Sequence, residues 1–155
     1  MAAKQRWLEE NLARIGKVSV ETMLPILYGP EWGYRNRARL SARRVPKKGG
    51  VLVGFREKRS TYIADMHECP VLPEKVSALI PGLKQLIEKL SINDRVPQIE
   101  VAVGDNATAF VFRHLLPLTG NDLSFLKEFS ESARIHVWLQ PGGPESAHQI
   151  GRAHV

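Results

Sequence analysis

The sequence has one cysteine and no long apolar run, and these two absences exclude several classes of protein. A lone Cys69 cannot form an internal disulfide, so we expect a reducing compartment, the cytoplasm. The longest apolar stretches, such as Met23 to Leu27, are far shorter than the roughly 20 residues that span a bilayer. The charged N-terminus has no apolar signal region. We therefore expect neither secretion nor a membrane partner for this chain.

Motifs for catalysis and cofactor binding are also missing, so the sequence predicts no catalytic residue. It has no glycine-rich phosphate loop after a strand, no GxSxG motif, and five histidines without the spacing of zinc ligands. His67 and Cys69 could share one strand face as a nucleophile pair. However, Pro70 ends that strand and no third orienting residue is apparent, which favours a half-buried free thiol.

Positive charge is abundant, and it is concentrated in the first half of the chain. Lys and Arg number 22 and Asp and Glu 16, which gives a net charge of +6 with neutral histidines. Residues 1–69 hold 14 basic and 7 acidic side chains, whereas residues 70–155 hold 8 and 9. Residues 35–59 contain ten basic residues and one acid, Glu57. Such a local field suits phosphate groups, although a merely solvated face is the alternative.

Hydrophobic spacing in the first half predicts a helix followed by strands. Residues 3–15 have a helical period, and residues 18–33 form an irregular connector rich in proline and glycine. From Tyr34 the period becomes two, and a turn at Pro46 to Gly50 separates this strand from a second one near 51–55. Residues 61–66 predict a third strand. Short connections make this region an antiparallel β-meander.

The second half predicts a helix and then a strand-strand-helix-strand unit. Apolar residues between Val76 and Leu90 follow a helical period, which Pro81 should kink or split. Strands are expected at 99–103, 108–112 and 135–139. Thr119 and Asp122 resemble a capping box before the helix that precedes the last strand. The predicted fold class is α+β, and we expect an unstructured tail over residues 146–155.

Three arginines at period two are the strongest functional signal. Arg35, Arg37 and Arg39 share one strand face at roughly 6–7 Å intervals, close to the phosphate repeat of a single nucleic-acid strand. Trp32 and Tyr34 place aromatic rings beside them, which favours unpaired RNA bases. The alternative is an edge strand that its charge protects from aggregation. Other residues predicted to bind RNA are Lys47, Lys48, Arg56, Lys58 and Arg59.

Three motifs occur in order along this region: WGYRNRARLS at 32–41, VGFREK at 53–58 and CPVLP at 69–73. Together they resemble the central region of the bacterial 23S rRNA (uracil-C5)-methyltransferases of the RumA type. The opening Lys4-Gln5-Arg6 and the closing WLQPGG at 138–143 resemble that region too, so the similarity covers about residues 3–145. An ordered set of motifs is more specific than any one of them.

The resemblance implies a parent enzyme that transfers a methyl group from S-adenosylmethionine to C5 of a uridine in 23S rRNA. Members of that family carry a TRAM domain, a four-cysteine [4Fe–4S] site, this central domain and a methyltransferase domain. Within that scheme Cys69 matches the fourth cluster ligand, and the basic strands match a surface that holds ribosomal RNA. The chain contributes these features without the TRAM and methyltransferase domains or the other three cluster ligands.

We therefore expect a lead-in helix at 1–16 and a central RNA-contacting domain at 17–145, inactive alone and without bound cofactor. Two alternatives stay open. One is a non-catalytic RNA-binding or ribosome-associated module that uses the same basic strands. The other is a relative that modifies tRNA, against which the Cys69-Pro70 motif argues.

Overall fold

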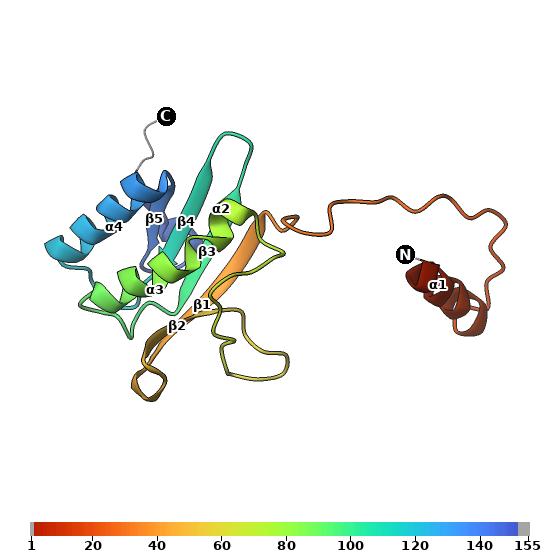
Figure 1. Ribbon diagram of the computed structural model, residues 1–155, viewed down its shortest axis with the longest axis horizontal. Coiled ribbons are helices and arrows are strands. Elements are labelled where there is room, and N and C mark those ends of the chain that lie inside the picture. Colours follow the sequence, from red (N-terminus) through yellow and green to blue (C-terminus); the bar gives the residue numbers. More distant parts are fainter. Residues whose placement is uncertain (1, 152–155) are drawn as a thin grey trace. The chain divides into compact units, whose positions relative to one another are not determined.

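The computed structural model describes residues 2–151, which form two compact units that divide between Pro30 and Glu31. The first unit contains α1 (Ala2–Arg14) and an extended segment that follows it (Figure 1). No residue of α1 is buried. The helix predicted over 3–15 is confirmed. The division into a lead-in helix at 1–16 and a central domain at 17–145 stays a prediction.

The second unit is built on one six-stranded sheet. Its strand order is β2-β1-β3-β4-β5-β6, and every neighbouring pair is antiparallel except β4 with β5. The crossover from β4 to β5 passes through a helix, as a parallel pair requires. The strands are β1 (Arg37–Val45), β2 (Gly50–Gly54), β3 (Gln98–Val103), β4 (Thr108–Arg113), β5 (His136–Gln140) and β6 (His148–Gly151).

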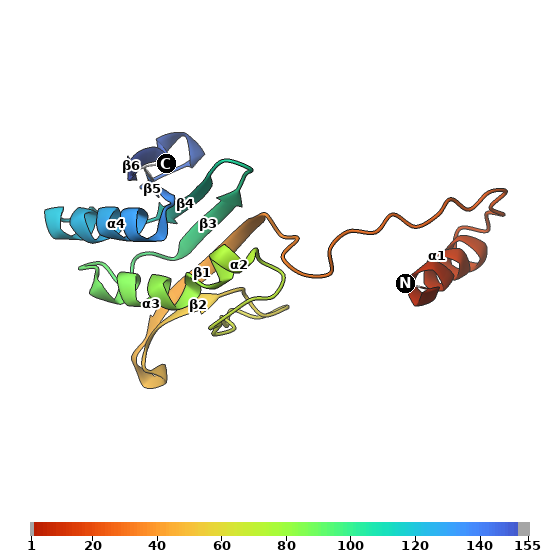
Figure 2. The same cartoon turned by 45° about the horizontal axis from the view of Figure 1, so that its top comes forward.

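Helices cover one face of this sheet, as Figures 1 and 2 show. They are α2 (Glu74–Ser77), α3 (Ile80–Lys89) and α4 (Gly120–Ala133). Pro81 lies in the first turn of α3, so it splits the predicted helix in two rather than interrupting its hydrogen bonds. Alternate strand residues meet the helices and are buried, among them Leu40, Ile99, Phe110 and Val137. The α+β class predicted from the sequence is confirmed.

The predicted capping box at the start of α4 is present and extends into a buried network. The Thr119 side chain accepts a hydrogen bond from the Asp122 backbone, and the Asp122 carboxylate accepts one from the Thr119 backbone at 2.8 Å. The same carboxylate accepts bonds from the Ser91 N–H at 2.8 Å and the Ser91 hydroxyl at 2.6 Å. Because Ser91 follows α3, the end of α3 and the start of α4 share one carboxylate.

The pairing of the strands differs from the predicted meander in two places. Residues 61–66 form no named strand and pair with the chain after β2 through one bridge, Arg56 with Ile63. β1 takes β3 as its second neighbour, which is far away in sequence. The tail also differs, because residues 144–146 form a short 3₁₀ helix and β6 follows at the sheet edge. Residues 152–155 of that tail lie outside the described residues.

Candidate nucleic-acid interface

The sheet face opposite the helices carries the arginines of β1. Side chains alternate along each strand, so the neighbours of buried core residues point to this second face. We call it the outer face, and its members follow from the strand registers. They are Arg37, Arg39, Gln98, Glu100, Ala102, Ala109, Val111, Arg113, His136 and Trp138.

Arg35, Arg37 and Arg39 line a single shallow hollow on the outer face, with a volume of about 460 Å³. Its floor is formed by Ala102 and Val111 of the neighbouring strands. The Arg35 guanidinium lies 4.8 Å from the centre of the Phe55 ring, a cation–π contact that helps to fix it. The sequence spacing of these three arginines therefore corresponds to a shared surface concavity.

Arg39 is partly neutralised by an acid that the sequence pattern did not reveal. Its guanidinium nitrogen Nη2 lies 3.0 Å from Glu100 Oε1, in the register pair that joins β1 to β3. Gln98 Nε2 donates a second hydrogen bond of 2.9 Å to the same oxygen. The Arg39 side chain is 69% exposed and that of Glu100 is 40% exposed, so water screens the ion pair. We call Arg35, Arg37 and Arg39 the arginine stripe. Among the described residues, two guanidinium groups of the arginine stripe belong to no ion pair and the third is paired with a carboxylate.

A second basic hollow adjoins the first and shares Arg39 with it. Arg56 and Arg113 complete its positively charged wall, and Gln98 also lines it. Arg56 was predicted to bind RNA, but Arg113 was not, because it stands in the half of the chain that has no excess of positive charge. The signal that could have found it is the period of two on its own strand, which places Arg113 on the face of Val111.

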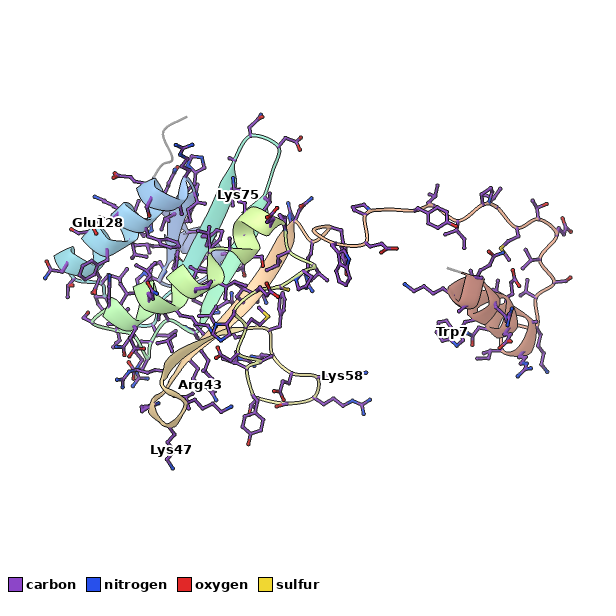
Figure 3. The ribbon with its side chains drawn as sticks, viewed as in Figure 1. Trp7, Arg43, Lys47, Lys58, Lys75 and Glu128 are labelled. Carbon is purple, nitrogen blue, oxygen red and sulfur yellow. The ribbon has the colours of Figure 1, made fainter. Side chains whose placement is uncertain are left out.

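The other four basic residues that were predicted to bind RNA lie outside the two arginine-lined hollows. Lys47 and Lys48 belong to the 3₁₀ turn Pro46–Lys48 at the tip of the β1–β2 hairpin, while Lys58 and Arg59 lie in the loop after β2 (Figure 3). Lys48 lines a different hollow, which it shares with the acids Asp65 and Glu88. The structure therefore does not bring these four residues into the two arginine-lined hollows.

The neighbours of β1 bear on the alternative that its charge protects an edge strand. β1 lies between β2 and β3 and is hydrogen-bonded to both. The two pairings meet only at Ser41, because residues 41–45 pair with β2 and residues 37–41 pair with β3. Arg37 and Arg39 therefore stand on a stretch of β1 that pairs with a named strand on one side only. Protection of that stretch from aggregation stays the alternative to phosphate binding for Arg37 and Arg39, whereas Arg44 forms an ion pair with Glu88 of α3.

Cys69 is buried at the edge of another hollow, which Trp32, His67 and Glu68 also line. Backbone bonds from Gly33 to Pro70 and from Arg35 to Val71 tie this loop to the start of the arginine stripe. The described residues contain no group of three or more His, Cys, Asp or Glu side chains that could hold a metal ion. A [4Fe–4S] cluster needs four protein ligands, so the residues present do not by themselves fit one. Among residues 2–151, no helix is long and apolar enough to cross a membrane.

Comparison with known proteins identifies relatives of this chain. No family model matches it. Three curated relatives share the name 23S rRNA (uracil(1939)-C(5))-methyltransferase RlmD. The protein of Thiobacillus denitrificans is 58% identical over 95% of this chain, that of Aromatoleum aromaticum 54% over 96%, and that of Bordetella parapertussis 53% over 99%. The chain spans about a third of the length of these relatives, 33–34%.

A solved structure supports the fold. The Pyrococcus abyssi tRNA (uracil-54, C5)-methyltransferase, determined in complex with S-adenosyl-L-homocysteine, matches 97% of this chain and 36% of its own with a TM-score of 0.61. At 19% identity this likeness concerns the fold alone. The curated relatives agree with the resemblance that the three sequence motifs predicted. By its sequence the chain belongs to the family of the 23S rRNA (uracil-C5)-methyltransferases, of which it represents about a third of the length.

Proposed function

We propose that this chain is the rRNA-contacting part of an enzyme that methylates C5 of a uracil in 23S rRNA, uracil 1939 in the relatives' name. The observation that carries the proposal is the convergence of five arginines on two adjoining hollows of the outer face. Guanidinium groups bind phosphate bidentately, and an RNA strand offers a phosphate at every nucleotide. The chain's contribution is to bind and orient the substrate.

The methyl-transfer chemistry belongs, in this proposal, to the remainder of the full-length protein. S-adenosylmethionine would supply the methyl group there, which fits the S-adenosyl-L-homocysteine complex of the Pyrococcus abyssi protein. Cys69 is the residue that we assign as one ligand of an iron–sulfur cluster, because its CPVLP motif resembles the family segment that carries the fourth ligand. It is buried beside a hollow next to the arginine stripe. The chain alone is expected to transfer no methyl group from S-adenosylmethionine to 23S rRNA. Methylation by the purified chain would contradict this division of labour.

RNA binding by the purified chain tests the proposal directly. Fluorescence anisotropy of a labelled stem-loop with a uridine-containing loop, at several salt concentrations, should give a dissociation constant of ~10⁻⁴–10⁻⁶ M. Each neutralised phosphate contributes about −0.7 to the slope of log affinity against log salt concentration. Five arginines therefore predict a slope of about −3.5 at most, somewhat shallower because Arg39 is paired with Glu100. Changing Arg35, Arg37 and Arg39 to Gln should weaken binding and make the slope shallower by about 2, because Arg56 and Arg113 remain.

A matched control removes the same charge from the helix side of the sheet. Lys75, Lys89 and Lys127 are exposed on α2, α3 and α4. Changing all three to Gln should leave the affinity and its salt slope nearly unchanged. An equal loss of RNA affinity in the two triple variants would show that binding depends only on the net charge of the chain. A triple arginine variant that binds with the parental slope would refute the assignment of the outer face.

A further inference from the structure

We propose that the outer face binds unpaired RNA bases as well as phosphates, with Trp138 as the ring on which a base stacks. This inference rests on the proposed function and adds which part of the nucleotide the face recognises. Its basis is that Arg37 and Arg39 of β1 lie at one side of the outer face and the rings of His136 and Trp138 of β5 at the other. A sheet that presents aromatic rings between basic groups is a common way to hold single-stranded RNA.

The strand registers align two rows of side chains across the outer face. One row runs from Arg39 through Glu100 and Val111 to Trp138. The next row runs from Arg37 through Ala102 and Ala109 to His136. β1 and β5 are three strand spacings apart, or roughly 14 Å. An arginine side chain and an unpaired nucleotide together bridge such a distance, with phosphate toward β1 and base toward β5.

Small side chains keep the surface between the two sides low. Ala102 and Ala109 have only a methyl group, and Ala102 and Val111 line the hollow that the stripe arginines border. A flat base can therefore lie against the sheet there without displacing a large side chain. Glu100 does not oppose an anionic strand strongly, because Arg39 and Gln98 already engage its carboxylate. Its remaining acceptor capacity suits the N–H groups on the edge of a base.

Trp138 lies on the outer face because its neighbours Val137 and Leu139 are buried on the helix side. The Trp138 side chain is itself only partly exposed, so its ring is held by its surroundings, yet reachable. His136 is fixed beside it by Gln149, whose Nε2 lies 3.1 Å from His136 Nδ1. An ordered ring loses little freedom when a base stacks on it, which favours binding.

The decisive experiment makes Trp138 the single tryptophan by changing Trp7 and Trp32 to Phe. Titration with a short unstructured RNA should quench the fluorescence of Trp138, and a duplex of the same sequence should quench it far less. In anisotropy measurements, Trp138→Leu should weaken binding of the unstructured RNA about 5- to 100-fold. The salt slope should not change, because the substitution removes no charge. Trp138→Phe should keep most of the affinity, and Trp7→Leu on α1 serves as the control without effect.

The outcomes separate this inference from the proposed function. If RNA binds with the expected salt slope but Trp138 fluorescence is unchanged at saturation, base stacking is wrong and the phosphate contact stands. Parental affinity of Trp138→Leu for the unstructured RNA would refute base stacking in the same way. If no RNA binds at all, both proposals fail, and the outer face is then a packing surface for another protein part. Should Trp138→Leu fail to fold, the quenching titration still decides whether a base stacks on Trp138.

Discussion

Replacing Asp122 with Asn should destabilise the second unit strongly at neutral pH and progressively less in acid. The side chain of Asp122 is almost fully buried, at 1% exposure, and its carboxylate accepts four hydrogen bonds from Ser91 and Thr119. Burial by itself would raise the pKa of this carboxyl, but the bonds from Ser91 and Thr119 outweigh burial and lower the pKa from 3.8 to about 2.

The size of this effect follows from the pKa. A lowering from 3.8 to about 2 makes the ionised carboxylate contribute about 2 kcal/mol to the free energy of unfolding. Because the folded pKa is depressed, this contribution is complete above the unfolded value of 3.8 and is lost as the pH falls toward 2. Asn also turns an NH₂ group toward buried donors, so the total cost at pH 7 should be about 2–4 kcal/mol.

Urea unfolding, followed by circular dichroism at pH 7 and pH 3, measures both the pH-dependent contribution of the carboxylate and the cost of the Asn NH₂ group. The deficit of Asp122→Asn should narrow at pH 3, where about half of the carboxylate's contribution remains. Asp94 provides the control, because its side chain is 60% exposed and its ion pair with the neighbouring Arg95 lies at the surface. Asp94→Asn should change stability by less than about 0.5 kcal/mol. A pH-independent deficit, or parental stability of Asp122→Asn at pH 7, would refute the role assigned to this network.

The remaining predictions concern Gly54 of β2 and Cys69 in the loop that follows it. Cys69→Ser should leave the chain folded at a cost of about 1–2 kcal/mol in stability, because the thiol is buried. The parental chain, mixed with iron and sulfide without oxygen, should show no absorbance of a stoichiometric four-iron cluster, because it has one cysteine. Failure of the serine variant to fold, or four irons per chain, would contradict these statements. Gly54→Ala should cost about 1–3 kcal/mol in urea unfolding, because a Cβ there would clash with the Ala64 carbonyl oxygen. Gly120→Ala, with no atom within 4 Å of the added Cβ, should show no such loss.

Much of the secondary structure could be predicted because it depends on neighbours in sequence. The period of two places Ala38 and Leu40 inward and Arg37 and Arg39 outward, as the structure has them. The capping box at Thr119 and the helix break at Pro81 are equally local, since each involves groups within one helical turn. The prediction of a strand at 61–66 was wrong, because only one bridge joins this segment to the chain after β2.

The sequence by itself determined the α+β class, the arginine stripe and the family, because periodicity and ordered motifs are properties of short segments. Only the tertiary structure decided the neighbours of β1, the ion pair of Arg39 with Glu100 and the presence of Arg113 beside Arg56. It also placed Trp138 on the same face as the stripe. These features join residues that are distant along the chain. Which strands become neighbours depends on how they assemble around one hydrophobic core. Hydrophobic burial is non-directional, so a local sequence pattern does not specify the partner strand.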